Sequence, residues 1–132
     1  MQPVFFLVGL LVTQGDGFMS VANVSEIMRA FVIPPSNNLF NVGFEIPETD
    51  EAWKTVETSG LILAEAANLL ILPERSQGRA AWVQAAREMS EASQRALAAA
   101  RAQNGDEEEW FTLTEEILAA CSSCHDQFWI VN

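Results

Sequence analysis

Between residues 50 and 128, apolar side chains recur at intervals of three and four residues, with only two interruptions. This spacing places apolar side chains on one face of an α-helix, whereas a half-buried strand needs strict alternation. The interruptions are Pro73 and the pair Asn104-Gly105, both of which are typical helix terminators. Alanine, the strongest helix former, is abundant in the same region. The pattern therefore predicts three consecutive long helices.

The expected helices span residues 50–72, 76–103 and about 107–128, joined by short turns. Thr49 or Asp50 can cap the first of them, and Asp106 can cap the last, with Glu109 placed three residues later as in a capping box. Small residues on an inward face leave room for a neighbouring helix or for a bulky ligand. The inward-facing residues are predicted to be Trp53, Val56, Gly60, Leu63, Ala64, Ala67, Leu70 and Ile71; Trp82, Ala85, Met89, Ala92, Ala96 and Ala100; and Trp110, Leu113, Ile117, Cys121, Cys124, His125 and Phe128.

An earlier helix is expected from Ser20 onward. Its inward positions are predicted to be Val21, Val24, Ile27, Met28 and Phe31. Pro34-Pro35 should end it, because proline lacks an N–H and restricts the preceding residue. Residues 34–48 then form a loop anchored by Phe40 and Phe44. Short connections force neighbouring helices to be antiparallel, so the fold class predicted for these 132 residues is an all-α antiparallel four-helix bundle in a single domain.

The chain starts with an apolar stretch at residues 3–12, PVFFLVGLLV. It is too short to span a bilayer and has the length of a signal-peptide core. No Lys or Arg precedes it, so a first helix that packs on the domain is the alternative. We interpret residues 1–17 as a leader left from an export signal and residues 18–132 as the helical domain.

Residues 121–125 read CSSCH and contain both cysteines and the only histidine of the chain. CxxCH is the attachment signature of c-type haem. Residues three apart share a helix face, so the sulfurs of Cys121 and Cys124 can reach two vinyl groups of one porphyrin. The imidazole of His125 can then bind the iron as its proximal ligand. The motif predicts one covalently attached haem c near the C-terminal end of the bundle.

Other readings of the CSSCH motif fit less well. A thioredoxin-like CxxC belongs at the start of a helix that follows a strand, whereas this motif lies near the end of a helix in an all-α chain. A structural zinc site needs four ligands, and the chain offers only three Cys and His residues. A CxxC disulfide is geometrically poor within a regular helix.

A haem motif at the C-terminal end of a four-helix chain resembles the class II c-type cytochromes, the cytochrome c-prime and cytochrome c-556 family. The resemblance covers about residues 20–128 through VSEIMRAFVIPPSNNLF, EAWKTVETSGLILAEAANLLILPE and LAACSSCHDQF, of which the last is the most specific. It implies a periplasmic protein that receives its haem after export. It also implies a homodimer formed through the first two helices.

The resemblance further implies a role for a first-helix residue that faces the iron. In c-556-like members a methionine completes six-coordination, whereas in c-prime members this face is open and binds NO or CO. Met28 matches that position and is the candidate distal axial ligand. A methionine on an apolar helical face also commonly belongs to the core, so both roles stay open.

The chain departs from the family pattern in two places. Phe128 and Trp129 occupy the last two positions of the family's usual CHxxYR, so the basic residue is missing. Val24 stands one turn before Met28, where c-prime proteins often carry an arginine. These differences weaken the expectation of a gas-binding mechanism.

Composition narrows the function classes. The net charge of −11 disfavours binding to nucleic acid or to an anionic membrane surface and is compatible with a basic partner protein. The chain has a single histidine, so no second histidine is left to act as a distal base. The acidic residues are expected on solvated helix faces, and no other arrangement of residues typical of an active site is recognisable. The sequence predicts no enzyme but a periplasmic single-electron-transfer protein that meets redox partner proteins. A five-coordinate protein that binds NO or CO is the alternative.

Overall fold

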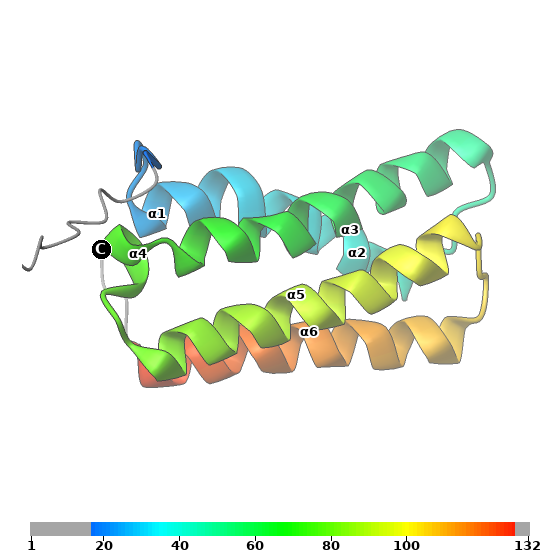
Figure 1. Ribbon diagram of the computed structural model, residues 1–132. Coiled ribbons are helices and arrows are strands. Elements are labelled where there is room, and N and C mark those ends of the chain that lie inside the picture. Colours follow the sequence, from blue (N-terminus) through cyan, green and yellow to red (C-terminus); the bar gives the residue numbers. More distant parts are fainter. Residues whose placement is uncertain (1–16, 129–132) are drawn as a thin grey trace, which may run out of the picture.

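The computed structural model describes residues 17–128, which form a bundle of helices with no strand among them (Figure 1). Three long helices confirm the prediction: α3 (Asp50–Ile71), α5 (Ala80–Arg101) and α6 (Glu107–Gln127). They are preceded by a rod built from α1 (Val24–Ile27), the π-helix η1 (Met28–Val32) and α2 (Ile33–Val42). A single turn, α4 (Pro73–Ser76), lies between α3 and α5. The all-helical fold class is therefore confirmed.

The caps that the sequence indicated are partly as expected. The hydroxyl of Thr49 accepts a hydrogen bond from the N–H of Ala52 at 3.1 Å, and so caps α3. The Asp106 carboxylate accepts the N–H groups of Glu108 and Glu109 at 3.0 and 3.1 Å. The reciprocal half of the predicted capping box is absent, because the Asp106 N–H donates to the side chain of Asn104 instead. The N-terminus of α6 is thus held by Asp106 alone.

The first rod differs most from the prediction. The helix begins at Val24, four residues later than expected, after an Asn23 cap that forms a capping box with Glu26. It does not end at Pro34-Pro35, and the predicted loop is largely the helix α2. Both prolines occupy the first turn of α2, where a missing N–H costs little. The π-turn before them, in which the Ile33 N–H donates to the Met28 carbonyl five residues back, makes this continuation possible.

The π-turn also changes which residues face inward. The buried positions Ile27 and Val32 are five residues apart, whereas a regular helix would repeat after three or four. Phe31, expected in the core, is therefore 43% exposed. Val21 lies outside the helix and is exposed, and Phe44, expected to anchor a loop, is 92% exposed. These three expectations were wrong, and Phe40 alone of the expected loop anchors packs against the core.

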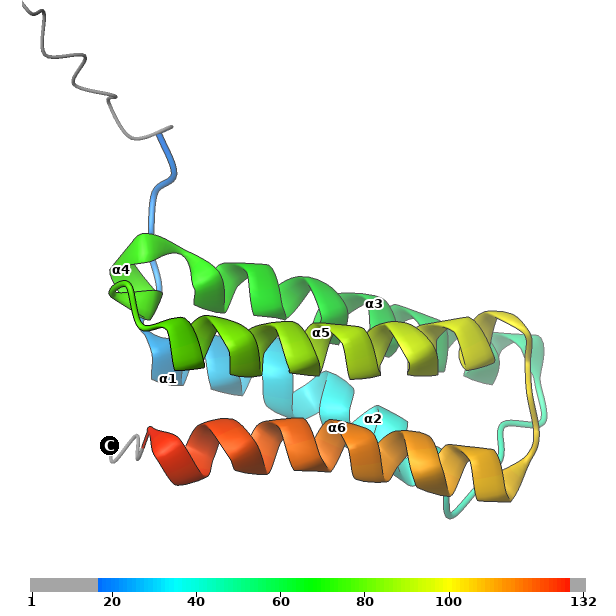
Figure 2. The same ribbon diagram turned by 60° about the horizontal axis from the view of Figure 1, so that its bottom comes forward.

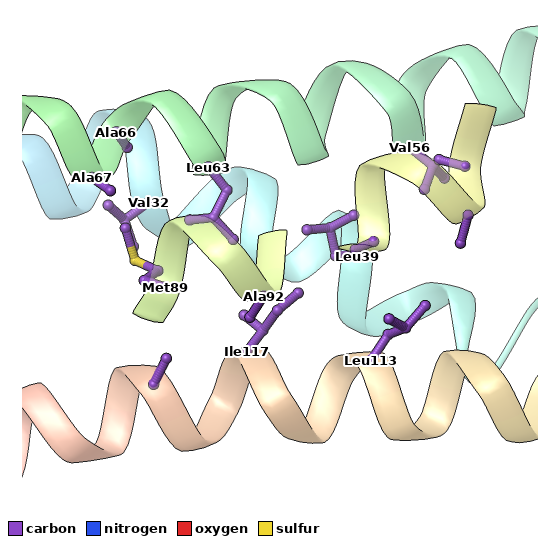
Figure 3. Close-up of a cluster of buried hydrophobic side chains, with 14 of the residues drawn as sticks. Val32, Leu39, Val56, Leu63, Ala66, Ala67, Met89, Ala92, Leu113 and Ile117 are labelled. Atoms are coloured by element: carbon purple, nitrogen blue, oxygen red, sulfur yellow. The ribbon is translucent and has the colours of Figure 1, made fainter. Parts of the chain in front are cut away.

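The core runs along the whole bundle. Side chains from all four rods meet in it, including Leu39 of α2, Leu63 of α3, Ala92 of α5 and Ile117 of α6 (Figure 3). The inward faces predicted for α3, α5 and the first half of α6 are confirmed by burial. A Cβ added to Gly60 would lie 3.1 Å from the Cα of Leu97, so this glycine allows α3 and α5 to approach each other. Gly60 therefore serves helix packing and not a ligand.

Two expectations concern the chain ends. Of the expected leader at residues 1–17, only Gly17 belongs to the described residues. Trp129 also lies outside the described residues. Among the helices within residues 17–128, none is both long enough and apolar enough to cross a membrane.

Candidate functional site

An apolar slot is lined by residues of η1, α3, α5 and the last turns of α6. These last turns of α6 lie at the same end of the bundle as α1 (Figure 2). Met28 of η1 and three residues of the CSSCH motif, Cys121, Cys124 and His125, all line the slot. The structure therefore brings together all four residues that the sequence singled out. The slot is lined by Met28, Val32, Leu70, Trp82, Ala85, Ala86, Met89, Ala120, Cys121, Cys124 and His125.

The wall that carries Met28 is held at both ends. On one side the Asn23 capping box fixes the start of α1. The guanidinium of the buried Arg75 also reaches across and donates to the Ala22 carbonyl at 2.9 and 3.2 Å, and to the Leu69 carbonyl at 2.7 Å. On the other side, the Ser36 hydroxyl donates to the Val32 carbonyl at 2.6 Å. These bonds fix the position of the π-turn and therefore that of Met28, which is half-buried.

The last turns of α6 line the slot as a regular α-helix. Cys121 and Cys124 are half-buried, and His125 is largely exposed while still lining the slot. Ala120 is buried behind them. The two cysteines are not joined to each other and are free thiols. The CSSCH motif thus presents two sulfurs and one imidazole at the rim of an apolar space.

Both thiols of the CSSCH motif have a pKa above that of an ordinary cysteine. Burial raises the pKa of Cys121, and the neighbouring Cys124 raises it further. Burial also raises the pKa of Cys124, although the positive charge of Arg79 acts in the opposite direction. An apolar environment disfavours the thiolate because the charge loses its hydration. Such cysteines are less prone than exposed ones to oxidation and to metal capture.

Four slot residues come from α5: Trp82, Ala85, Ala86 and Met89. Three of them were expected on the inward face of this helix, whereas Ala86 was not. The short turn between α5 and α6 makes the two helices antiparallel, so residues 82–89 must lie opposite the last turns of α6. That reasoning from the sequence could have placed them. Met89 is the notable member, because it brings a second thioether to the slot and is buried.

Arg79 lies just outside the slot and was not identified from the sequence. Its guanidinium carbon lies 4.3 Å from the centroid of the Trp82 ring and 5.0 Å from that of Phe128. Its Nε and Nη2 donate to the carbonyls of Ser76 and Arg75 at 3.0 and 2.9 Å. These contacts hold a positive charge near Cys124.

The donor atoms and the apolar walls of the slot suit a porphyrin, but the slot is narrow. Its volume is only about 30 Å³, which leaves no room for a macrocycle in this structure. A flat macrocycle would have to part η1 from α6. The described residues contain no cluster of three or more His, Cys, Asp or Glu side chains that could hold a metal ion directly. Two thiols and an imidazole at an apolar slot suit haem better than a bare ion.

The chain was compared with models of protein families, with curated proteins and with solved structures. None of these comparisons found a match. Inferences about function therefore depend on these residues and their arrangement.

Proposed function

We propose that this chain is a periplasmic c-type haem protein that transfers single electrons. In this proposal Cys121 and Cys124 hold one haem through thioether bonds, His125 is the proximal ligand of the iron and Met28 is the distal ligand. The expected leader at residues 1–17 would direct the chain to the compartment in which c-type haem is attached.

One observation carries the proposal. Met28 and the CSSCH motif, which lie far apart in the sequence, line the same apolar slot. A core methionine without this role could lie anywhere along the inward face of the first rod. Instead Met28 lines the same slot as His125.

The chain's residues have distinct tasks. Each cysteine would add its sulfur and its hydrogen across one vinyl double bond, an addition that needs no oxidant or reductant. Burial raises the pKa of both thiols, which favours the protonated form that carries this hydrogen. Trp82, Ala85 and Leu70 give the slot an apolar lining. Bound haem iron would supply the one-electron couple, and a thioether opposite an imidazole raises its potential.

The covalent link is tested by mass. The chain is produced in a host with periplasmic cytochrome maturation, extracted with acid acetone and weighed. We expect one haem per chain in the wild type and none in Cys121→Ala/Cys124→Ala. Each single variant should keep a haem attached through one bond. A pigment that washes out of the wild-type chain would overturn the proposal, and the same spectrum of masses reports the true N-terminus.

The distal ligand is tested by a matched pair of variants. Met28→Leu and Met89→Leu each replace one slot thioether by a side chain of similar volume. Met28→Leu should abolish the long-wavelength sulfur-to-iron charge-transfer band of the oxidised protein, whereas Met89→Leu should keep it. Loss of the band only in Met89→Leu would assign the ligand to α5. Absence of the band in the wild type, with a high-spin spectrum, would favour the NO- or CO-binding alternative.

A further inference from the structure

An apolar groove lies between the end of α2 and the first half of α6, two elements that Figure 2 shows side by side. The groove has a volume of about 320 Å³, and it shares no lining residue with the slot. Three of its large apolar side chains are exposed: Phe44 by 92%, Phe111 by 61% and Leu118 by 55%. Large apolar side chains that gather around one hollow of a surface commonly mark an interaction site.

The α6 side of the groove combines apolar and acidic side chains. Glu107, Phe111 and Glu115 are four residues apart and Leu118 follows three residues later, so all four share one face of the helix. Glu115 itself lines the groove. None of the ion pairs within residues 17–128 includes Glu107 or Glu115. This face therefore presents two carboxylates that have no cationic partner in the described part of the chain.

The two segments that form the groove carry no positive side chain apart from the titratable His125. Residues 33–49 contain two glutamates, and α6 contains five glutamates and one aspartate, but neither segment contains Lys or Arg. At the same end of the bundle, Lys54 of α3 and Arg95 and Arg101 of α5 each form an ion pair with a glutamate. Their charges are thus compensated, and the groove is left with a negative surrounding.

This charge decides what can occupy the groove. A second copy of the chain would bring its own carboxylates against Glu107 and Glu115, and like charges brought together at an interface are unfavourable. The three exposed side chains also offer only about 300–400 Å² of apolar surface, whereas a stable dimer needs about 800 Å² from each copy. A nucleic acid or an anionic lipid surface would be repelled. A short segment that carries positive charge beside an apolar side chain complements both features of the groove.

We propose that the groove is the docking site for a basic, amphipathic segment of a partner protein. Apolar side chains of this segment enter the groove, and its Lys or Arg side chains pair with Glu107 and Glu115. The inference does not depend on haem, because the groove and the slot share no residue. It gives a location to the basic partner that the net charge of −11 allows. Electrostatic attraction would raise the association rate, and the apolar contact would hold the complex.

The role of the carboxylates is tested with a defined probe, a fluorescein-labelled helical peptide that has leucines on one face and lysines beside them. Fluorescence anisotropy at about 0.1 M ionic strength gives its Kd for the full-length chain. Glu107→Gln/Glu115→Gln should raise the Kd about fivefold. Glu65→Gln/Glu91→Gln removes two exposed carboxylates outside the groove and should raise it less than about twofold. Equal losses would show attraction by net charge alone and would overturn the proposal.

The role of the apolar side chains is tested separately. Phe44→Ser/Phe111→Ser removes two exposed rings and should raise the Kd about tenfold or more. Phe18→Ser/Val21→Ser removes two exposed apolar side chains at the other end of the bundle and should leave the Kd unchanged. A second peptide, with serines in place of the leucines and the same lysines, makes the same comparison on the unaltered chain. An unchanged Kd for this second peptide would overturn the proposal.

Other occupants of the groove would give different results. Self-association of the wild-type chain that Phe44→Ser/Phe111→Ser abolishes, as measured by sedimentation, would assign the groove to a second copy. Peptide binding that starts only after removal of residues 1–16 would assign it to the apolar leader. Either result would overturn the proposal. The expected peptide affinities in a chain that carries no haem would support the docking site and refute only the proposed function.

Discussion

The two walls of the slot are built differently. The α6 wall is an ordinary helix in which a short motif of consecutive residues carries the chemistry. The η1 wall is a π-turn followed by two prolines, held by an asparagine cap and a buried arginine. The comparison teaches that a regular helix can be read from local spacing, whereas the irregular wall depends on contacts that come from elsewhere in the chain.

The strongest test of this comparison is to convert the irregular η1 wall into a regular α-helix. Pro34→Ala/Pro35→Ala restores two N–H donors and should let the π-turn relax to an α-helix. One residue of register turns a helix by about 100°, which would rotate Met28 relative to α2 and out of the slot. We expect the sulfur-to-iron band to disappear while the covalent haem content stays unchanged. A variant that keeps the band would show that the prolines do not position Met28.

Glycine substitutions compare the tight packing of the long helices with the looser end of the first rod. Gly60→Ala forces a Cβ to within 3.1 Å of the Leu97 backbone, and it should lower the free energy of unfolding by about 1–3 kcal/mol. Gly43→Ala is the matched control, because its nearest neighbour would be 3.7 Å away. Denaturant unfolding measures both. Equal stability of the two variants would mean that α3 and α5 can separate at little cost.

Removal of either of two helix caps should have a smaller effect on stability. A comparison of the two removals still distinguishes the η1 wall of the slot from the rest of the bundle. Asn23→Ala and Thr49→Ala each remove a side chain that accepts an N–H bond, and each should cost about 1 kcal/mol of unfolding free energy. Only Asn23→Ala acts on the segment that carries Met28. We therefore expect it alone to weaken the sulfur-to-iron band, as measured by optical titration. A similar loss of the band in Thr49→Ala would contradict the local role of the Asn23 cap.

The smallest expected effect concerns the thiols of the α6 wall. Because burial raises the pKa of both cysteines, their alkylation in the haem-free chain should keep accelerating above the pH at which an ordinary thiol is ionised. The unfolded chain ionises first, so folding stability should fall as pH rises through that range. Arg79→Gln should move the Cys124 rate profile to higher pH, because Arg79 opposes the rise in its pKa. Profiles like those of free cysteine would contradict the burial.

Much of the fold could be predicted from the sequence. The stops at Pro73 and Asn104-Gly105, the Thr49 and Asp106 caps and the spacing of apolar residues predicted three long helices. The inward faces were correct for α3, α5 and the first half of α6, whereas α5 begins at Ala80 and not near Ser76, and His125 is exposed. The first rod could not be predicted in this way. Proline is normally a signal for the end of a helix, and no local pattern indicates that a π-turn precedes Pro34 and Pro35. The segment that contains the turn is held by tertiary contacts such as the hydrogen bond from Arg75 to the Ala22 carbonyl.

The candidate site was predictable to a similar extent. Cys121, Cys124 and His125 form a local motif that needs no structure to be read. Met28 was singled out only through the family resemblance, and its place opposite the motif came from the structure. Arg79 was missed because its importance comes from stacking on Trp82 and Phe128, which are distant from one another in the sequence.

The bond between the Arg75 guanidinium and the Ala22 carbonyl also limits how the chain can be trimmed. A cut at the end of the expected leader leaves Ala22 in place as an anchor only a few residues from the new amino terminus. A cut beyond Ala22 would remove the one carbonyl that accepts two of the three hydrogen bonds of the buried Arg75, and would release the start of the first rod. A trimmed chain that keeps this anchor must therefore retain Ala22, which is bound by an arginine more than fifty residues further along the chain.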